Sequence, residues 1–112
     1  MAYRSRIKIG VEVLRFPGDL NTLEMVKIKN RLTRLVNKNH KHLLLDLKRT
    51  RHVELAGLGI LVDRLIKIRA QQGDIKLCNL RPEVEKTFQM IGVGGLMQSF
   101  GSEEEALQSF AA

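Results

Sequence analysis

The amino-acid sequence predicts an α/β fold in which helices pack on a mainly parallel β-sheet. Apolar residues alternate with a period of two in some segments and recur at helical spacing in the segments between them. Strands that alternate with helices along a chain pair mostly in parallel. The 112 residues, 44% of them hydrophobic, are enough to bury the core of one domain, and no repeat or linker divides them. We therefore expect a single domain over residues 1–112.

The first predicted element is a strand with one buried face, over residues 7–13. Its apolar residues alternate with Lys8, Gly10 and Glu12, and residues 14–16 extend it as far as the turn signal Pro17-Gly18. The alternating apolar positions are Ile7, Ile9, Val11 and Val13.

An amphipathic helix is predicted over residues 22–37. Asn21 followed by Glu24 resembles a capping box at its start. One face is apolar and the opposite face is basic. The apolar residues are Met25, Ile28, Leu32, Leu35 and Val36, and the basic residues are Lys27, Arg31, Arg34 and Lys38.

The middle of the chain predicts a central strand, a basic loop and a second helix. Residues 43–47 are almost continuously apolar, as in a strand buried on both faces. The second helix covers residues 57–72, and Gly73 has the position of a left-handed residue that ends it. The loop contains Lys48, Arg49, Thr50, Arg51 and His52, and the apolar helix positions are Leu58, Leu61, Leu65 and Ile68.

The last third predicts two more strands and two more helices. Residues 74–79 form a strand, and Pro82 opens a helix that Gly92 closes. Residues 96–100 form a short strand, and Ser102 with Glu105 caps a terminal helix that runs through Phe110.

Positive charge is the unusual feature of the composition. Nineteen Lys and Arg against 12 Asp and Glu give a net charge of +7, which favours an acidic partner such as nucleic acid, anionic lipid or an acidic protein surface. The helix over residues 22–37, through Lys27, Arg31 and Arg34, is the candidate for binding nucleic acid. Few aromatic residues are present for base stacking, which makes this interpretation the weaker one.

The sequence lacks the motifs of several kinds of binding and catalytic site. Gly57-Leu-Gly59 has Val62 where a dinucleotide fingerprint needs a third glycine, and no phosphate-binding P-loop is present. Cys78 is the only cysteine, and it lies inside a predicted strand, so neither a disulfide nor a catalytic thiol is expected.

We expect no enzyme activity, no cofactor and no metal site. His40, His42 and His52 lack the further ligands that a zinc site needs. No apolar run reaches the roughly 18 residues of a membrane span. These features favour a cytoplasmic location.

The ordered set of segments resembles the STAS domain family and its anti-sigma factor antagonists. The matching pieces are Gly18-Asp19-Leu20, residues 43–47, 56–59 and 73–79, Val84 to Gly92, and Glu103 to Leu107. The resemblance covers nearly the whole chain. It implies a mixed, mainly parallel sheet of about four to five strands packed with about four helices. It also implies work done by protein–protein binding.

In the antagonists, a motif similar to Asp-Ser-Ser-Gly-Leu-Gly opens the second helix, and an anti-sigma factor that is also a kinase phosphorylates its second Ser. Here Glu54, Leu55 and Ala56 occupy the first three positions, while Gly57, Leu58 and Gly59 match. Asn21 also replaces an Asp that is common after the Gly-acid-Leu turn. Since Ala56 has no hydroxyl group, the resemblance predicts a binding surface locked in the state equivalent to unphosphorylated. The alternative is that the fold binds another kind of partner, and that the absence of the serines reflects only this difference.

We expect the interface to comprise the loop over residues 48–56 and the exposed face of the second helix. A basic loop beside an apolar helix entrance predicts a partner with an acidic rim. The interface residues would be Glu54, Leu55, Ala56, Gly57, Leu58, Asp63, Arg64 and Lys67, with Lys48, Arg49, Thr50 and Arg51 in the basic loop.

The expected partner is an anti-sigma factor, a histidine-kinase-like ATPase with Ser kinase activity, or another STAS-containing assembly. The alternative is a subunit docked on a transporter's ATPase or beneath a lipid surface. We expect a monomer or a weak dimer. Thr50 is interpreted as an exposed loop residue, with phosphorylation beside its basic neighbours as the alternative.

Overall fold

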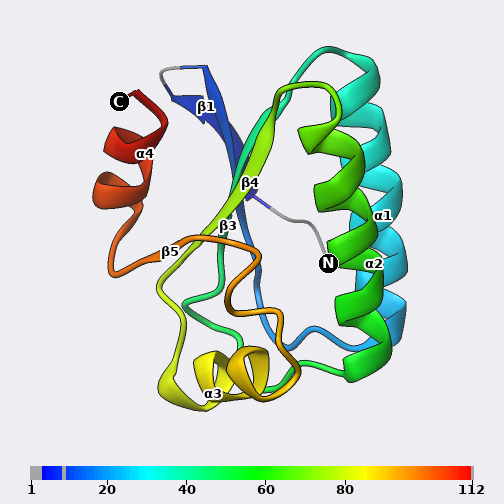
Figure 1. Cartoon of the computed structure of the whole chain (residues 1–112), viewed down its shortest axis with the longest axis vertical. Helices are drawn as coiled ribbons and strands as arrows, with labels where there is room; N and C mark the ends of the chain where they lie inside the picture. Colours follow the sequence, from blue (N-terminus) through cyan, green and yellow to red (C-terminus); the bar gives the residue numbers. More distant parts are fainter. Residues whose placement is uncertain (1–3, 9, 112) are drawn as a thin grey trace.

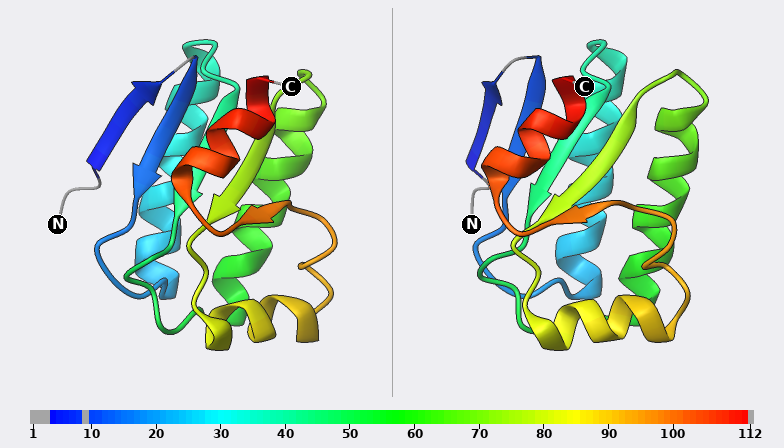
Figure 2. Two further views of the ribbon diagram at one scale, coloured as in Figure 1. Left: turned by 90° about the vertical axis from the view of Figure 1, so that its left-hand side faces the viewer. Right: turned by 60° about the vertical axis from the view of Figure 1, so that its left-hand side comes forward.

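Helices pack on both faces of one β-sheet in the computed structural model, which describes residues 4–8 and 10–111. Helices α1 (Thr22–Asn37) and α2 (Leu55–Arg69) lie side by side on one face, and α4 (Glu103–Ala111) lies on the other (Figure 1). Helix α3 (Pro82–Met90) lies at one end of the sheet, as the two turned views also show (Figure 2).

The sheet has five strands in the order β1-β2-β3-β4-β5. Strands β2 to β5 are parallel to one another, and β1 pairs with β2 in the antiparallel direction. The predicted α/β class and mainly parallel sheet are therefore confirmed. The strands are β1 (Arg4–Lys8), β2 (Val11–Arg15), β3 (His42–Asp46), β4 (Asp74–Cys78) and β5 (Ser99–Phe100).

The N-terminal segment corrects the prediction of one strand over residues 7–13. It is a hairpin, in which Lys8 pairs with Val11 and Gly10 has a positive φ of 76°. Glycine adopts this conformation without the steric cost that other residues bear, so the chain reverses here. Ile9 lies outside the described residues.

Helix α1 has the predicted bounds. The side-chain Oδ1 of Asn21 accepts a hydrogen bond from the backbone N–H of Glu24 at 2.9 Å, which confirms Asn21 as the N-cap. Of the predicted basic face, Lys27, Arg34 and Lys38 are exposed, whereas Arg31 is half-buried and its guanidinium group lies 3.9 Å from Glu12.

Helix α2 begins two residues earlier than predicted and ends at Arg69. The left-handed residue after it is Gln72, with φ of 65°, and not Gly73. Gly73 is required for another reason: a Cβ atom there would overlap the backbone carbonyl of Lys41. Here glycine permits a close approach of two backbone segments.

The last elements agree with the prediction in type. Strands β4 and β5 are shorter than predicted, whereas α4 extends to Ala111, one residue beyond the predicted Phe110. Pro82 is in the first turn of α3, and Gly92 follows this helix with φ of 78°. Strand β5 has only two residues. The Ser102 hydroxyl accepts the backbone N–H of Glu105 at 3.1 Å at the start of α4.

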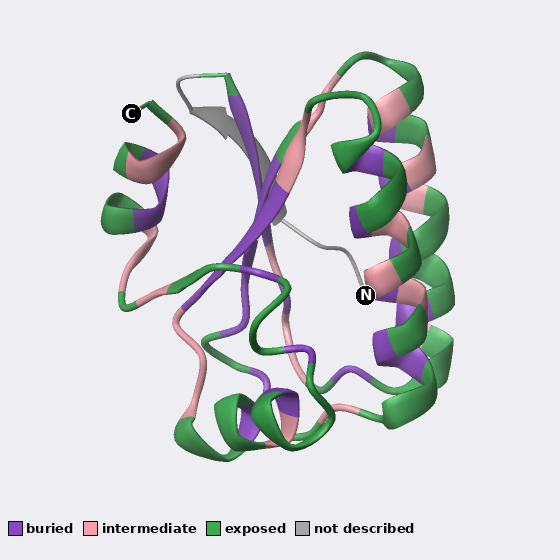
Figure 3. Cartoon of the chain, viewed as in Figure 1, coloured by how far each residue is buried: buried purple, intermediate pink, exposed green. Residues whose placement is uncertain are grey.

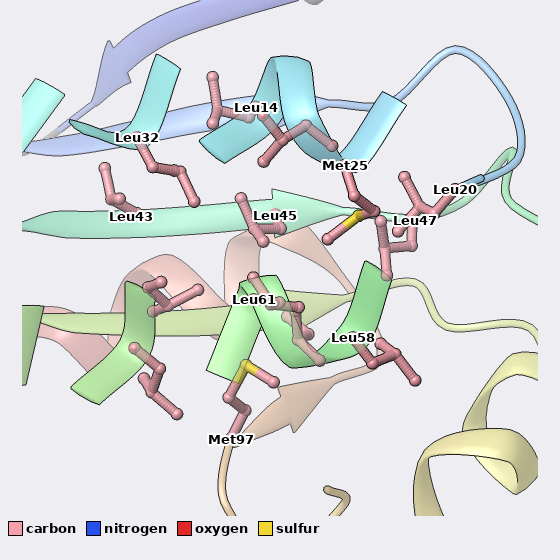
Figure 4. Packing of buried hydrophobic residues seen from close by; sticks show 14 of the residues in the cluster. Leu14, Leu20, Met25, Leu32, Leu43, Leu45, Leu47, Leu58, Leu61 and Met97 are labelled. Carbon is pink, nitrogen blue, oxygen red and sulfur yellow. The ribbon is translucent and has the colours of Figure 1, made fainter. Parts of the chain in front are cut away.

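The two faces of the sheet bury two separate apolar clusters, and the burial pattern follows them (Figure 3). The larger cluster fills the space between the sheet and α1, α2 and α3, and Figure 4 shows part of it around Leu45, Leu61 and Met97. The smaller cluster lies under α4. It comprises Val11, Val13, Leu44, Cys78, Ala106 and Leu107.

Candidate functional site

Two loops join at the end of the sheet where the parallel strands finish, in front of the entrances of α1 and α2. Leu20 and Val53 form an isolated parallel bridge. The N–H of Leu20 donates to the carbonyl of His52 at 3.0 Å, and the N–H of Glu54 donates to the carbonyl of Leu20 at 2.9 Å. The loop before α2 is thus held by the loop before α1.

Asp19 strengthens this junction with its side chain. Its Oδ1 accepts the backbone N–H groups of Arg51 at 2.8 Å and His52 at 3.1 Å. The hydrogen bond from Arg51 is the main cause that lowers the pKa of the Asp19 carboxyl group, because donated hydrogen bonds favour the charged form.

Thr50 is buried, which corrects the interpretation of an exposed loop residue. Its hydroxyl donates to the backbone carbonyl of Gly18 at 2.8 Å. A phosphate group on this side chain would have to displace that contact and the surrounding atoms, so phosphorylation of Thr50 does not fit the folded domain. Thr50 supports the loop from inside and is not an interface residue.

Glu54 connects the entrances of the two helices. It occupies the N-cap position of α2, but its carboxylate makes no hydrogen bond to the α2 backbone. It accepts the backbone N–H of Thr22 at 3.2 Å and the Thr22 hydroxyl at 2.9 Å instead. Glu54 therefore satisfies a free N–H group in the first turn of α1 and fixes the position of the α2 entrance relative to it.

Three of the residues that face solvent at these two entrances are small or aliphatic, and they lie beside the exposed polar residues Asn21, Thr22 and Glu54. Leu55 is 63% exposed, Leu23 is 64% exposed, and Ala56 is exposed beside Leu55. We call Leu23, Leu55 and Ala56 the entrance platform. Leu55 and Ala56 were predicted as interface residues. Leu23 was not, although it lies off the face of α1 that carries Met25 and Ile28.

Gly57 and Leu58 belong to the interior, which corrects their assignment to the interface. Leu58 is only 1% exposed and packs in the larger cluster. A Cβ atom on Gly57 would overlap the Cγ of Met25, so glycine is needed here for the close packing of α1 against α2.

The three charged residues farther along α2 are not equivalent. Asp63 and Lys67 are exposed, and their charged atoms lie 3.3 Å apart. The Arg64 side chain is only 14% exposed, and its buried Nε atom has no hydrogen-bond partner among the described residues. Arg64 therefore presents less of its side chain to a partner than the sequence suggested.

The basic loop lies beside the entrance platform. Lys48, Arg49 and Arg51 are exposed, and none of them makes an ion pair with the described residues. The backbone of Lys48 is fixed, since its N–H donates to Asp46 at 2.9 Å and its carbonyl accepts Arg81 Nε at 3.0 Å. The unpaired charges of this loop can therefore attract an acidic partner, while the backbone that carries them stays in place.

A hollow of about 630 Å³ lies on the other side of this loop, and sequence reasoning did not find it. Arg15 donates from Nε and Nη2 to the Glu103 carboxylate at 2.6 and 2.7 Å. Asp46 accepts the Asn79 side chain at 3.2 Å. Burial, followed by a hydrogen bond with Glu103, raises the pKa of the Asp46 carboxyl group.

The remaining candidate groups do not assemble into a reactive or metal-binding site in the described part of the chain. Burial raises the pKa of the Cys78 thiol, which disfavours the reactive thiolate. No three His, Cys, Asp or Glu side chains among the described residues are placed to hold a metal ion. His40 lies 3.6 Å from Glu12, while the His42 ring packs edge-on against Phe110.

Within residues 4–8 and 10–111, no helix has the length and apolar character that crossing a membrane requires.

Sequence comparisons connect this arrangement to known proteins. A family model described as STAS domain matches residues 3–106. A putative anti-sigma factor antagonist, BtrV of Bordetella bronchiseptica, is 27% identical over 101 residues, which cover 90% of this chain and 87% of that protein. An anti-sigma F factor antagonist of Paenibacillus polymyxa is also 27% identical, covering 88% of this chain and 85% of that protein.

Solved structures share the fold at lower identity. A putative anti-sigma factor antagonist from Thermotoga maritima has a TM-score of 0.92 at 19% identity, covering 98% of this chain and 95% of that one. Unphosphorylated SpoIIAA, an anti-sigma factor antagonist, has a TM-score of 0.84 at 23% identity, covering 98% and 96%. A sulfate transporter family protein from Wolinella succinogenes has a TM-score of 0.76 at 14% identity, covering 93% and 87%.

Proposed function

The chain belongs to the STAS domain family, and from this premise we propose that it is a regulatory module of the anti-sigma factor antagonist type, which acts by binding another protein. Its partner would be an anti-sigma factor of the histidine-kinase-like ATPase class. Sigma factors work on RNA polymerase, so this proposal carries a cytoplasmic location with it. The transporter-associated alternative has less support, because its structural relative is 14% identical whereas the antagonists are 27% identical.

One observation carries the proposal: the entrance platform is apolar, exposed and rigidly supported. Leu55 and Ala56 follow a loop held by the Leu20–Val53 bridge, the Thr50 hydroxyl and the Glu54 carboxylate. Exposed aliphatic groups on a fixed backbone bind a partner with little loss of conformational entropy. The flanking Lys48, Arg49 and Arg51 would speed encounter with an acidic rim.

The second part of the proposal is that the platform is constitutively in its binding state. Ala56 is the second residue of α2 and has the position of the family's phosphoacceptor serine, as the resemblance of residues 54–59 implies. A phosphate there would bring about −1.5 to −2 charges and three acceptor oxygens to an apolar contact surface. An alanine side chain cannot accept it, so the partner's kinase activity would not release this chain.

Capture of the partner from the native host, followed by mass spectrometry, tests the first part. We expect an anti-sigma factor of the ATPase class to bind the wild-type chain and to be lost with Leu55→Glu, because a buried anchor contributes enough for its loss to weaken binding about 30-fold or more. Ile66→Glu is the matched control, since Ile66 is equally exposed on the same helix. Equal loss with both variants, or retention with Leu55→Glu, would contradict the proposed site.

Ala56→Ser tests the second part with the captured partner and ATP. We expect the serine variant to become phosphorylated and then to dissociate, while the wild-type chain stays unmodified and bound. If the partner binds the variant but never modifies it, the platform is not a lost phosphorylation site. If it modifies the wild-type chain elsewhere and releases it, the constitutive state is wrong.

A further inference from the structure

A ridge of exposed residues runs along the whole of α1. Leu23, Lys27, Asn30, Arg34 and Lys38 are all exposed and follow one another at intervals of three or four residues. That spacing places them on one side of the helix. The ridge lies away from the buried Met25, Ile28, Leu32 and Leu35, and Figure 3 shows the exposed outer side of the helix. At a rise of 1.5 Å per residue it is about 22 Å long.

The charges on α1 are almost all positive. Glu24 is its only acidic residue, and it lies 3.4 Å from the ammonium group of Lys27. Lys29, Arg34 and Lys38 make no ion pair with the described residues. Helix α4, on the opposite face of the sheet, carries three glutamates and no cation. Helix α1 is therefore positively charged, whereas α4 is negatively charged.

The C-terminal end of the ridge borders a hollow of about 260 Å³. Its polar walls are Arg31, Arg34, Lys38, His40 and Glu12. Glu12 is matched by Arg31 at 3.9 Å and faces His40 at 3.6 Å. Arg34 and Lys38 remain available to a phosphate group at the mouth of this hollow, because their charges are not used within the described part of the domain.

We propose that the α1 ridge, which shares Leu23 with the entrance platform, docks on an anionic phospholipid surface. The ridge carries Lys27, Arg34 and Lys38, and the last two make no ion pair with the described residues, which favours a polyanion over a single acidic side chain. The ridge is convex and its outward residues line no apolar pocket, whereas protein partners are usually anchored in pockets. Lipid headgroups rearrange around a convex helix and need no preformed groove.

The aliphatic residues of the ridge favour lipid over nucleic acid. Leu23 is 64% exposed and Val26 beside it is 42% exposed, at the end of α1 that carries no free cation. Such side chains gain by entering the boundary between headgroups and acyl chains. Proteins that bind single-stranded nucleic acid use aromatic side chains that stack on the bases, and α1 contains no aromatic residue.

The expected binding is reversible and sensitive to salt. Each cation near an anionic bilayer contributes about a fivefold increase in partitioning. Arg34 and Lys38, with or without Lys27, therefore predict a preference of about 25-fold to about 125-fold for anionic over neutral vesicles. The preference should shrink as salt shortens the range of the electrostatic attraction.

Co-sedimentation of the purified full chain with vesicles tests the proposal. We expect binding to vesicles of phosphatidylglycerol and phosphatidylcholine, and none to vesicles of phosphatidylcholine alone. Arg34→Glu should weaken binding about 25-fold, because it removes one attraction and adds one repulsion. Lys86→Glu is the matched control: it changes the net charge equally at an exposed site on α3, and we expect a loss below about threefold.

Three results would overturn the proposal. They are equal losses with Arg34→Glu and Lys86→Glu, equal binding to neutral and anionic vesicles, and tighter binding, dependent on Arg34, to a DNA duplex of about 30 base pairs at the same salt concentration. Far-UV circular dichroism verifies that each variant is folded. Lys38→Glu at the other end of the hollow gives a second reading, for which we expect a similar loss.

Discussion

The two faces of the sheet are built differently. The face under α1 and α2 is covered by an extensive apolar cluster that includes Leu45, Leu61 and Phe88. The face under α4 has a thin cluster, and polar contacts supplement it: the bidentate Arg15–Glu103 pair, and Lys76, whose ammonium group lies 2.9 Å from the Ser109 hydroxyl and 4.4 Å from the centre of the Phe110 ring.

The helices on the two faces are therefore held to the sheet by different kinds of interaction. The entrance platform lies on the face with the larger cluster. There, burial of apolar area fixes α1 and α2 to the sheet and fixes the two helix entrances relative to each other. Helix α4 is attached by a few contacts whose strength depends on charge. We therefore expect the platform to keep its shape under conditions that loosen α4.

The largest expected effect on stability comes from a substitution in the larger cluster. Leu45→Ala should lower the free energy of unfolding by about 2–5 kcal/mol, because Leu45 is fully buried in the larger cluster and its removal leaves a cavity. Leu107→Ala, at the rim of the smaller cluster with 8% exposure, should cost about 2 kcal/mol or less. Urea denaturation measures both values. Equal costs would remove the distinction between the two faces.

The next effect concerns the charged attachment of α4. Glu103→Gln should cost about 1 kcal/mol, because it removes the charge from a bidentate, half-buried pair with Arg15. Amide hydrogen exchange should accelerate in α4 and stay unchanged in α1. Glu104→Gln is the control, since Glu104 is exposed and one residue away. Faster exchange in both helices would mean that α4 does not loosen separately.

Two aspartates predict opposite responses to pH. The pKa of Asp46 is raised by burial, so the folded state holds a proton that the unfolded state releases, and the free energy of unfolding should fall as pH rises above the ordinary Asp value of about 3.9. The pKa of Asp19 is lowered, so its contribution should be lost as pH falls below that value.

Urea denaturation at a series of pH values separates the two contributions. Asp46→Asn should reduce the loss of stability as pH rises above about 4, and Asp19→Asn should reduce the loss on acidification below that value. The Asp46 effect should be the larger one, because Asp46 is buried and Asp19 is exposed. A wild-type slope that survives Asp46→Asn would assign it to other groups.

The smallest expected effect on stability separates folding from binding at the platform. Ala56→Asp places a negative charge in the first turn of α2, where the helix dipole favours it, so stability should stay the same or rise by about 0.5 kcal/mol. Binding of the captured partner should nevertheless weaken, because the charge enters an apolar contact. Thermal denaturation and calorimetric titration measure the two quantities. Unchanged binding would place the contact elsewhere.

Local sequence signals were sufficient where neighbours along the chain determine the structure. The Asn21 cap and the helical spacing gave the bounds of α1, and Pro82 and Gly92 marked the ends of α3. The N-terminal hairpin was missed because the apolar alternation continues through the turn, and a period of two does not reveal a reversal of direction. Gly10 was the only local sign of it.

The candidate site was predicted in part, because several of its features depend on residues distant along the chain. Thr50 is buried by its contact with Gly18, 32 residues away. Glu54 caps α1 and not its own helix. The exposure of Leu55 and Ala56 agrees with the expectation from the helix entrance. The burial of Leu58 agrees with its helical spacing to Leu61 and Leu65 and not with its assignment to the interface.

Hydrogen exchange on the complex with the captured anti-sigma factor tests the central claim most directly. We predict that binding will slow exchange in residues 19–23 and 51–58, which form the two loops and the helix entrances, and will leave α4 unchanged. Slower exchange in α4, with no change at the entrances of α1 and α2, would contradict the account and place the binding surface on the face of the sheet that α4 covers.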